Sequence, residues 1–200
     1  MQTKTSQVKN LAILISGSGS NMQAIIDAIE NGAINAKISV VISSNDIAFG
    51  LQRAKNHNIK THITSLKEFG SAQARDKKIL EILKPLNIDY VILAGYLGII
   101  TSEFIAQYKD KIINIHPSLL PKFGGSGMHG QNVHKAVIAA GEKVSGATVH
   151  LVDDGIDTGR ILAQDSLDIL PTDTPESLAK RILDNIEHKL LVKTLGEVCR

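Results

Sequence analysis

The chain alternates short apolar runs with segments of helical periodicity, and this alternation limits the possible fold more than any other feature. Leu11–Ile15 is a continuous apolar run, typical of a strand that is buried on both faces. A glycine-rich turn follows it, and apolar residues then recur at helical spacing from Met22 to Ile29. A second strand is predicted at Lys37–Ser43. Strand, turn, helix and strand make a βαβ unit, which predicts a parallel sheet.

The alternation continues along the chain and then changes after Asn114. The first part adds predicted helices at 48–57, 72–83 and from a Ser102 cap through Tyr108, and predicted strands at 61–64 and 89–95. The second part adds a helix at 131–140, a strand at 147–152 with a hairpin partner at 161–169, and a last helix that begins at Thr174-Pro175. The expected class is α/β: a Rossmann-like, mostly parallel twisted sheet with helices on both faces. We expect one domain over residues 1–200, with an N-terminal lobe at about 10–110 and a C-terminal lobe at about 111–200.

Composition argues against several classes of partner. The net charge of +2, the aromatic content of 4% and the lack of Trp argue against nucleic acid and membrane surfaces. The longest apolar stretch, 91–100, contains two glycines and is far shorter than the ~20 residues that span a bilayer. Met1–Asn10 lacks the apolar run of a signal peptide, and the single Cys199 cannot form an internal disulfide. A cytoplasmic protein is therefore expected.

Asn114 and His116 form the first candidate site, at the end of the apolar segment 112–115. Residues two apart on a strand point to the same face, so the amide and the imidazole are expected side by side. Pro117 favours an extended conformation at His116. A neutral hydrogen-bond donor beside a titratable one is suited to stabilising an oxyanion and moving a proton at one centre.

The turn Ser16–Asn21 is the second candidate. Its glycines let the backbone approach an anion, and the following helix offers free N–H groups. It lacks the Gly-Lys-Ser/Thr of a P-loop and the third glycine of a dinucleotide fingerprint, so a single phosphate fits better than a pyrophosphate. An ordinary strand-to-helix turn with a Ser or Asn cap is the alternative.

The third candidate is the segment 146–159, in which a strand leads into an acidic loop that carries Asp157 between two glycines. A carboxylate that faces an imidazole can orient its tautomer and relay protons. A solvated turn is the alternative, and considered alone it is the better one. Glycine at 155 and 159 also indicates a mobile loop. No histidine or cysteine spacing supports a metal site, so no metal is expected.

Five segments in this order resemble a known family: ISGSGSN at 15–21, SSNDIAFGLQRAK at 43–55, DYVILAGYLGII at 89–100, NIHPSLLPKF at 114–123 and GATVHLVDDGIDTGRIL at 146–162. Together they are similar to the phosphoribosylglycinamide formyltransferases, a folate-dependent formyltransferase family. The resemblance covers about Leu11 to His188 and implies the formyltransferase fold. It implies transfer of the formyl group of 10-formyltetrahydrofolate, the co-substrate, to the amine of glycinamide ribonucleotide in purine synthesis.

The resemblance also implies roles for individual residues. Asn114, His116 and Asp157 match the catalytic residues, and Gly19, Ser20, Asn21 and Glu187 match those that bind the ribonucleotide. The folate-binding residues that it implies are Leu97, Gly98, Ile99, Ile100, Asn114, Val152, Asp153, Asp154, Gly155, Ile156 and Asp157. The implied partners are these two small molecules, with no nucleic acid and no membrane, and the implied assembly is a monomer or a homodimer.

Four positions depart from the family pattern. Ala72 and Gly98 stand where some relatives carry arginines that contact the glutamate tail of folate, and Arg75 or Lys77 is a possible substitute. The loop at 124–129 is about one residue longer than in some relatives, so the role of His129 is open. The segment from Arg181 to Glu187 is also one residue longer than the pattern.

Two other functions compete with the transferase. A hydrolase of the same fold would release formate from the folate and would not need the glycine turn for a ribonucleotide. A non-catalytic nucleotide-binding module would use Asn114 and His116 only to satisfy backbone groups. The joint presence of all three candidate sites favours the transferase.

Overall fold

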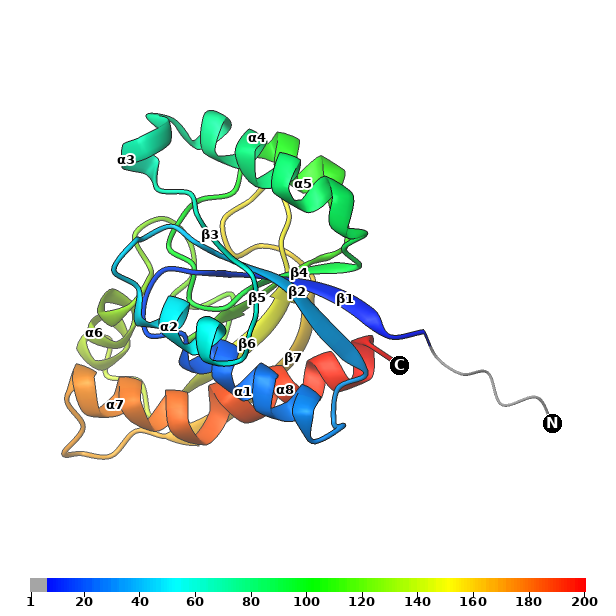
Figure 1. Cartoon of the computed structure of the whole chain (residues 1–200). Coiled ribbons are helices and arrows are strands. Elements are labelled where there is room, and N and C mark those ends of the chain that lie inside the picture. The colour runs from blue at the N-terminus through cyan, green and yellow to red at the C-terminus, as the bar shows by residue number, and fades with distance from the viewer. Residues whose placement is uncertain (1–6) are drawn as a thin grey trace.

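Within residues 7–200, which are the residues that this computed structural model describes, seven strands form one sheet in the order β3-β2-β1-β4-β5-β6-β7 (Figure 1). The strands are β1 (Lys9–Ile15), β2 (Ala36–Ser43), β3 (Thr61–Ile63), β4 (Tyr90–Leu93), β5 (Ile112–His116), β6 (Val144–Leu151) and β7 (Ile161–Asp168). β1 to β5 pair in parallel, whereas β6 runs antiparallel to β5, and β7 runs antiparallel to β6. The predicted mostly parallel α/β sheet and its terminal hairpin are confirmed. Part of the segment Met1–Asn10 lies outside the described residues.

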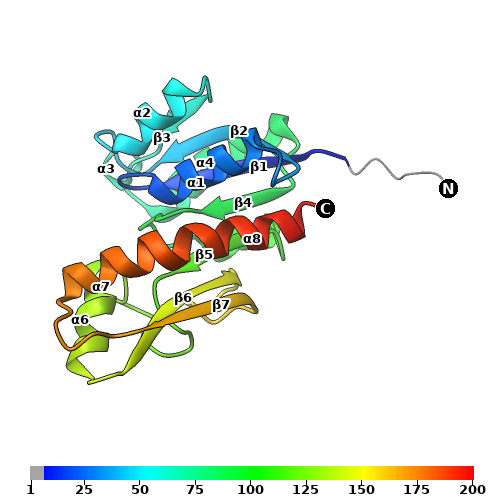
Figure 2. The same ribbon diagram turned by 90° about the horizontal axis from the view of Figure 1, so that it is seen from below.

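Helices cover both faces of the sheet (Figures 1 and 2). They are α1 (Ser20–Glu30), α2 (Phe49–Asn56), α3 (Leu66–Phe69), α4 (Ala72–Leu83), α5 (Ser102–Gln107), α6 (Gln131–Ala139), α7 (Pro175–Ile182) and α8 (His188–Val198), with a 3₁₀ turn at Lys84–Leu86 and a π-helical turn at Leu183–Glu187. α1, α7 and α8 lie on one face, and α4 and α5 lie on the other. None of the described helices is long and apolar enough to cross a bilayer.

The continuous apolar runs of the strands are explained by two cores, one on each face of the sheet. Leu11, Ile13 and Ile15 of β1 pack with residues of α1 and α8, whereas Ala12 and Leu14 pack in the cluster on the α4 and α5 side. Successive side chains of a strand point to opposite faces, so a strand covered on both faces has to be apolar at every position.

Local sequence explains most helix ends. α7 begins at Thr174, which forms a capping box with Ser177, and Pro175 occupies the first position, as predicted. α5 differs from the prediction, because its capping side chain is Thr101 and not Ser102. α3 was not predicted, since four residues are too few to show a helical period.

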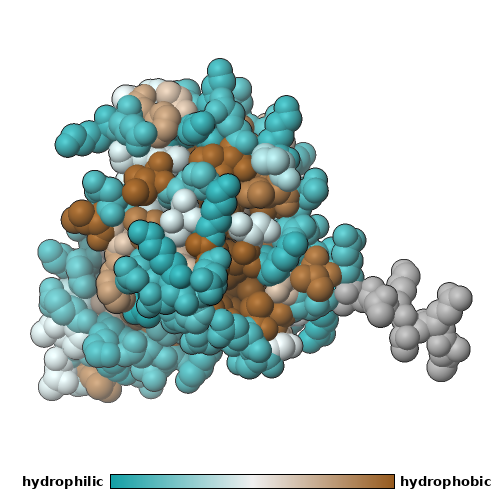
Figure 3. Space-filling model, in the orientation of Figure 1, coloured by the Kyte–Doolittle hydropathy of each residue, from teal (hydrophilic) through white to brown (hydrophobic). Residues whose placement is uncertain are grey.

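The strand order reverses beside β1, which lies between β2 and β4. Ligands of such sheets bind outside the carboxyl ends of the strands at this point. Those ends lead into the glycine turn after Ile15, the segment after Leu93 and the loop after His116. β5 ends at His116, and its parallel pairing with β4 extends to Asn114. In the view of Figure 3 the surface is largely hydrophilic, with apolar patches between the polar side chains.

Candidate active site

A cavity of about 800 Å³ opens at the carboxyl ends of the strands. It is large enough for a small-molecule ligand, since such sites measure roughly 300–1,000 Å³. All residues with a site role assigned from the sequence line it: Gly19, Ser20, Asn21, Leu97, Gly98, Ile99, Ile100, Asn114, His116, Val152, Asp153, Asp154, Gly155, Ile156, Asp157 and Glu187. The three candidate sites of the sequence therefore form one site.

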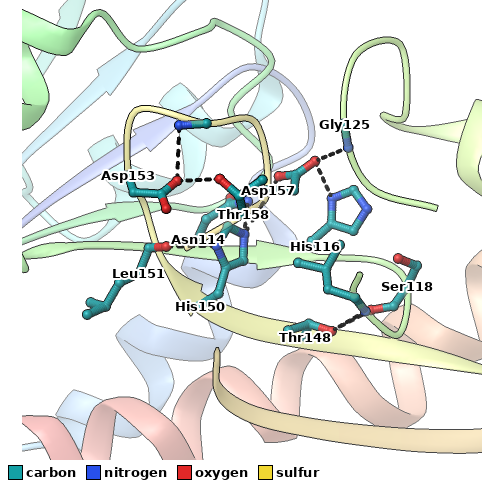
Figure 4. Close-up of polar contacts among 12 residues, drawn as sticks. Asn114, His116, Ser118, Gly125, Thr148, His150, Leu151, Asp153, Asp157 and Thr158 are labelled. Carbon is teal, nitrogen blue, oxygen red and sulfur yellow. Dashed lines mark hydrogen bonds and ion pairs between the residues drawn. The ribbon is translucent and has the colours of Figure 1, made fainter. Parts of the chain in front are cut away.

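His116 ends β5 and is only 4% exposed. Its Nε2 lies 2.9 Å from the carbonyl oxygen of Phe123. A carbonyl only accepts, so Nε2 carries the proton and donates. Nδ1 is then the nitrogen that faces the carboxylate of Asp157, with Nδ1 and Oδ2 3.5 Å apart. The ring is anchored through Nε2, and its Nδ1 faces Asp157, as the dashed line between the two side chains in Figure 4 shows.

Asn114 is oriented by a histidine on the neighbouring strand. β5 and β6 pair so that His150 lies opposite Asn114, and Asn114 Nδ2 lies 3.0 Å from His150 Nε2. His150 Nδ1 lies 2.9 Å from the carbonyl of Leu151 and donates to it, so Nε2 accepts from the amide. Burial lowers the pKa of His150, which favours this neutral form. Within residues 7–200 the second N–H of the Asn114 amide has no hydrogen-bond partner, so it is available to a ligand.

Asp157 lies between the two histidines. Its Oδ2 accepts from the backbone N–H of Gly125 at 3.1 Å, and its Oδ1 lies 3.7 Å from His150 Nε2. Asp157 has a φ of 59°, in the left-handed region that Asp and Asn tolerate better than most residues. The backbone is therefore bent at the residue that brings a carboxylate next to His116.

The acidic loop is closed by its own hydrogen bonds. Asp153 Oδ1 accepts from Gly155 N at 3.1 Å and from Thr158 Oγ1 at 2.7 Å (Figure 4). The two glycines have a packing role, since a Cβ at Gly155 would lie 1.9 Å from Thr158 Oγ1 and one at Gly159 would lie 1.8 Å from the Leu151 carbonyl. Close packing is therefore a reason for glycine at 155 and 159 that is separate from the mobility expected of this loop.

The glycine turn lies at the opposite end of the site. Gly19 has a φ of 70°, and a Cβ there would lie 2.7 Å from the Cα of Gly50 at the start of α2. Gly50 N also donates to the carbonyl of Gly17 at 3.0 Å. The turn is thus fixed by a direct backbone-to-backbone contact, and the residues that begin α1, Ser20 and Asn21, line the cavity. The first N–H groups of a helix have no partner within the helix.

Glu187 meets this turn from the far end of the chain. Asn21 Nδ2 donates to Glu187 Oε2 at 2.8 Å, and the two residues are 6% and 8% exposed. Burial raises the pKa of Glu187, and the Asn21 hydrogen bond partly opposes this. Glu187 ends the π-helical turn, which lies where the family pattern implied one extra residue. A π turn accommodates one additional residue inside a helix.

Two histidines contribute more than the sequence indicated. His150 was part of a motif without a role of its own, and the Asn114–His150 strand pairing that gives it one cannot be read from the sequence. His134 of α6 lines the cavity, is 4% exposed and has no partner at Nδ1. Burial, with a smaller effect of His116, lowers the pKa of His134 to about 4, so the ring is neutral at pH 7.

The remaining expectations concern residues at the margins. His129 is exposed and lines the cavity, whereas Ala72 does not line it. Arg75 is 3% exposed and paired with Asp76, so it is not free to replace the missing surface arginines. Among residues 7–200, no group of three His, Cys, Asp or Glu residues is arranged to hold a metal ion.

Comparison with known proteins gives a consistent match. The formyl transferase family profile matches residues 9–195. A phosphoribosylglycinamide formyltransferase of Haemophilus influenzae is 41% identical over 174 residues, which cover 87% of this chain and 80% of that protein. The chloroplastic phosphoribosylglycinamide formyltransferase of Arabidopsis thaliana is 38% identical over 192 residues, or 96% of this chain. This chain spans only 65% of the length of the plant protein.

The solved structures agree with this match. The crystal structure of phosphoribosylglycinamide formyltransferase from Brucella melitensis superimposes with a TM-score of 0.87 and 40% identity, covering 96% of each chain.

Proposed function

This chain belongs to the formyl transferase family, and from that premise we propose that it moves a formyl group from 10-formyltetrahydrofolate to the amine of glycinamide ribonucleotide. The products are the formylated ribonucleotide and tetrahydrofolate, in purine synthesis. One observation carries the proposal: a single cavity is lined both by the glycine turn, whose form is suited to an anion, and by Asn114, His116 and Asp157.

We propose that the acceptor occupies the end of the cavity at Gly19, Ser20, Asn21 and Glu187. The N–H groups at the start of α1 are suited to one phosphate. The buried Glu187 carboxyl, fixed by Asn21, would accept hydrogen bonds from ribose hydroxyls. A phosphate at one end and a polar sugar contact nearby direct the amine of the acceptor toward Asn114.

The donor would occupy the other end. Its walls are the segment Leu97–Ile100 and the loop Val152–Asp157. Leu97 and Ile99 are 61% and 66% exposed, and apolar side chains of this size on the rim of a cavity are suited to a flat aromatic ring system. This arrangement would place the formyl group of the donor between the two walls, beside His116.

Asn114, His116 and Asp157 then have distinct tasks. When the amine attacks the formyl carbon, the carbonyl oxygen gains negative charge. The free N–H of Asn114 and a proton on His116 Nδ1 would donate to it, and a pair of such donors is the usual way to stabilise an oxyanion. Asp157 would stabilise positive charge on the ring, since its carboxylate is 3.5 Å from Nδ1.

The proton balance of the proposed reaction is simple. The amine loses one proton as its nitrogen becomes an amide, and the leaving nitrogen of the folate gains one. Asp157 and His116 would carry that proton between the two nitrogens. Two substrates held in contact geometry would supply much of the remaining rate enhancement.

A spectrophotometric assay of the folate product tests this function. The protein is mixed with 10-formyltetrahydrofolate, or a 5,8-dideaza analogue, with and without glycinamide ribonucleotide. Product that depends on the ribonucleotide is the expected result. Product formed equally without it would indicate a hydrolase, and binding of both ligands without any product would indicate a binding module.

We also propose that the whole chain works as one formyltransferase domain in a reducing compartment such as the cytoplasm. Cys199, the single cysteine, is buried and free. Burial raises the pKa of its thiol to about 11, so the thiol is protonated and unreactive at neutral pH.

A further inference from the structure

The segment Leu97–Ile100 is held from inside the protein by a buried ion pair on α4. Arg75 and Asp76 are 3% and 1% exposed. Arg75 Nε donates to Asp76 Oδ1 at 2.8 Å, and its Nη2 donates to the carbonyl of Ile99 at 2.5 Å. Asp76 Oδ2 accepts from the backbone N–H of Thr101 at 2.7 Å. The pair thus holds two backbone groups of the segment, although no residue of α4 lines the cavity.

Gly98 rests directly on this pair. A Cβ at Gly98 would lie 2.8 Å from Arg75 Nη1 and 2.7 Å from the ring of Tyr96. The Arg75 guanidinium in turn lies over that ring, 5.8 Å from its centroid. Since real Cβ atoms essentially never come within 3.0 Å of another heavy atom, a side chain at 98 would force the segment, the Tyr96 ring or the guanidinium to move. The guanidinium, held by Asp76 and Ile99, is therefore one of the two groups against which Gly98 packs.

The outer side of the same segment is the donor wall proposed above. Leu97, Gly98 and Ile99 line the cavity. The backbone N–H of Leu97 donates to Ser16 Oγ at 2.8 Å. The acceptor end is built from α1 and from the π turn before α8 and shares no residue with α4. A change at Arg75 therefore acts first on the donor wall, because Arg75 and Asp76 hydrogen-bond directly to Ile99 and Thr101.

We propose that Arg75 is a positioning residue that sets the donor wall by holding Ile99 and supporting Gly98 from below. The inference depends on the proposed function for one point only, that the donor is a folate. It also explains, without reference to a ligand, why position 98 is glycine: the guanidinium occupies part of the space that a side chain would need. Arg75 never touches the substrate and acts through the backbone at 98–101.

Arg75→Lys is the first test. Lysine keeps the charge beside Asp76, but a single ammonium cannot hold Asp76 and the Ile99 carbonyl at once in the geometry of the guanidinium. Loss of one charge-assisted hydrogen bond to the segment should raise the KM for the folate donor about tenfold. The KM for glycinamide ribonucleotide should stay unchanged. Lys78→Ala is the matched control, because Lys78 lies on the same helix and pairs with Glu81 at the surface, at 3.2 Å.

Gly98→Ala tests the contact from the other side. Alone, the added methyl should also raise the donor KM about tenfold, since the segment must move to make room. Lysine lacks the Nη1 group, so in the Arg75→Lys background only the Tyr96 ring still opposes the methyl. The double variant should therefore show a donor KM well below the hundredfold rise of two independent effects.

Amide hydrogen exchange of the ligand-free protein tests the role of Arg75 without any substrate, and so independently of the proposed function. In Arg75→Lys the Thr101 amide should exchange at least about tenfold faster, while the Val91 and Ala94 amides of the sheet should not change. Unchanged Thr101 exchange, an equal rise of both KM values, or additive effects in the double variant would overturn the proposal. If the wild type transfers no formyl group, the proposed function fails, and the Thr101 exchange still decides the role of Arg75.

Discussion

At the scale of single residues, the two imidazoles of the site are fixed in opposite ways. His116 donates from Nε2 to Phe123, and His150 donates from Nδ1 to Leu151. The first therefore presents Nδ1 to Asp157, and the second presents an accepting Nε2 to Asn114. The backbone carbonyls, which only accept, decide which nitrogen of each ring is available for chemistry.

Asn114→Ala and Asp157→Asn should each fold normally and lose about 10²–10³ in kcat, because each removes one partner of the proposed oxyanion and proton machinery. The measurement is steady-state turnover with both substrates saturating, alongside thermal unfolding. Asp110→Asn is the matched control, since Asp110 is an exposed residue with a φ of 60°, close to the 59° of Asp157. Wild-type turnover in either variant would refute the assigned roles.

Glu187→Gln separates stability from binding. Burial raises the pKa of Glu187, so the folded state holds this proton more tightly than the unfolded state does. The free energy of unfolding then falls as pH rises above the ordinary pKa of 4.5 and through the folded-state value. Glutamine cannot ionise, so the variant should unfold at a higher temperature than the wild type at pH 7.5, with a difference that vanishes near pH 4.5.

The same variant should bind the acceptor about tenfold more weakly, because a neutral amide is a poorer acceptor for ribose hydroxyls than a carboxylate. The measurements are thermal unfolding between pH 4.5 and 8 and the KM for glycinamide ribonucleotide. If the wild type unfolds at a higher temperature than Glu187→Gln at pH 7.5, the buried carboxylate does not destabilise the fold.

At the scale of elements, the least expected feature is the π turn between α7 and α8. Leu178, Ile182, Ile186 and Leu190 repeat every four residues and are all buried. In a regular helix such a repeat drifts by about 40° at each step, so one face cannot stay buried over so many turns. The wider π turn at Leu183–Glu187 takes up this drift. The four-residue spacing of these apolar residues is therefore a sequence signal for the π turn.

Deletion of Asn185 should be tolerated. Removing one exposed residue from the π turn converts it to an α-helical turn and leaves α8 facing as before, so the melting temperature should change by less than about 4 °C. Deletion of Lys193 is the control, because in a regular helix it rotates Leu195 and Cys199, both 0% exposed, out of the core. That deletion should destabilise the protein by several kcal/mol, about 2–5 for one large apolar side chain. Equal effects of the two deletions would contradict this account.

The sequence predicted most elements because each carried a local signal. The apolar runs marked strands buried on both faces, and Thr174-Pro175 marked the start of α7. What it could not predict depends on tertiary contacts: the pairing of Asn114 with His150, the burial of Arg75 beneath Gly98, and the approach of Gly19 to Gly50. Each of these joins residues from different elements, for which local propensity carries no information.

At the scale of the whole molecule, the site is assembled from segments far apart in the chain. Asn21 and Glu187 are 166 residues apart in sequence and share one buried hydrogen bond. Helix α8 packs on α1, so the segment that carries Glu187 lies beside the proposed acceptor end (Figure 2). Ligand binding should therefore stabilise the entire fold and not one lobe alone.

This predicts a ligand-dependent melting temperature. Glycinamide ribonucleotide at 100 times its dissociation constant should stabilise the protein by about 2.7 kcal/mol, which corresponds to roughly 5–10 °C for a chain of this size. Glu187→Ala should reduce this shift and leave the shift caused by a folate analogue unchanged. A ribonucleotide shift that is insensitive to this substitution would mean that the acceptor binds elsewhere.

The most direct measurement follows the formyl carbon itself. The donor is prepared with ¹³C in its formyl group and mixed with the protein and unlabelled glycinamide ribonucleotide, and the carbon is followed by NMR in wild type and in Asp157→Asn. The account predicts that the label moves to the amide of the ribonucleotide in the wild type and at least about 10²-fold more slowly in the variant. Label that accumulates as formate whether or not the ribonucleotide is present, or transfer at equal rates in the two proteins, would contradict it.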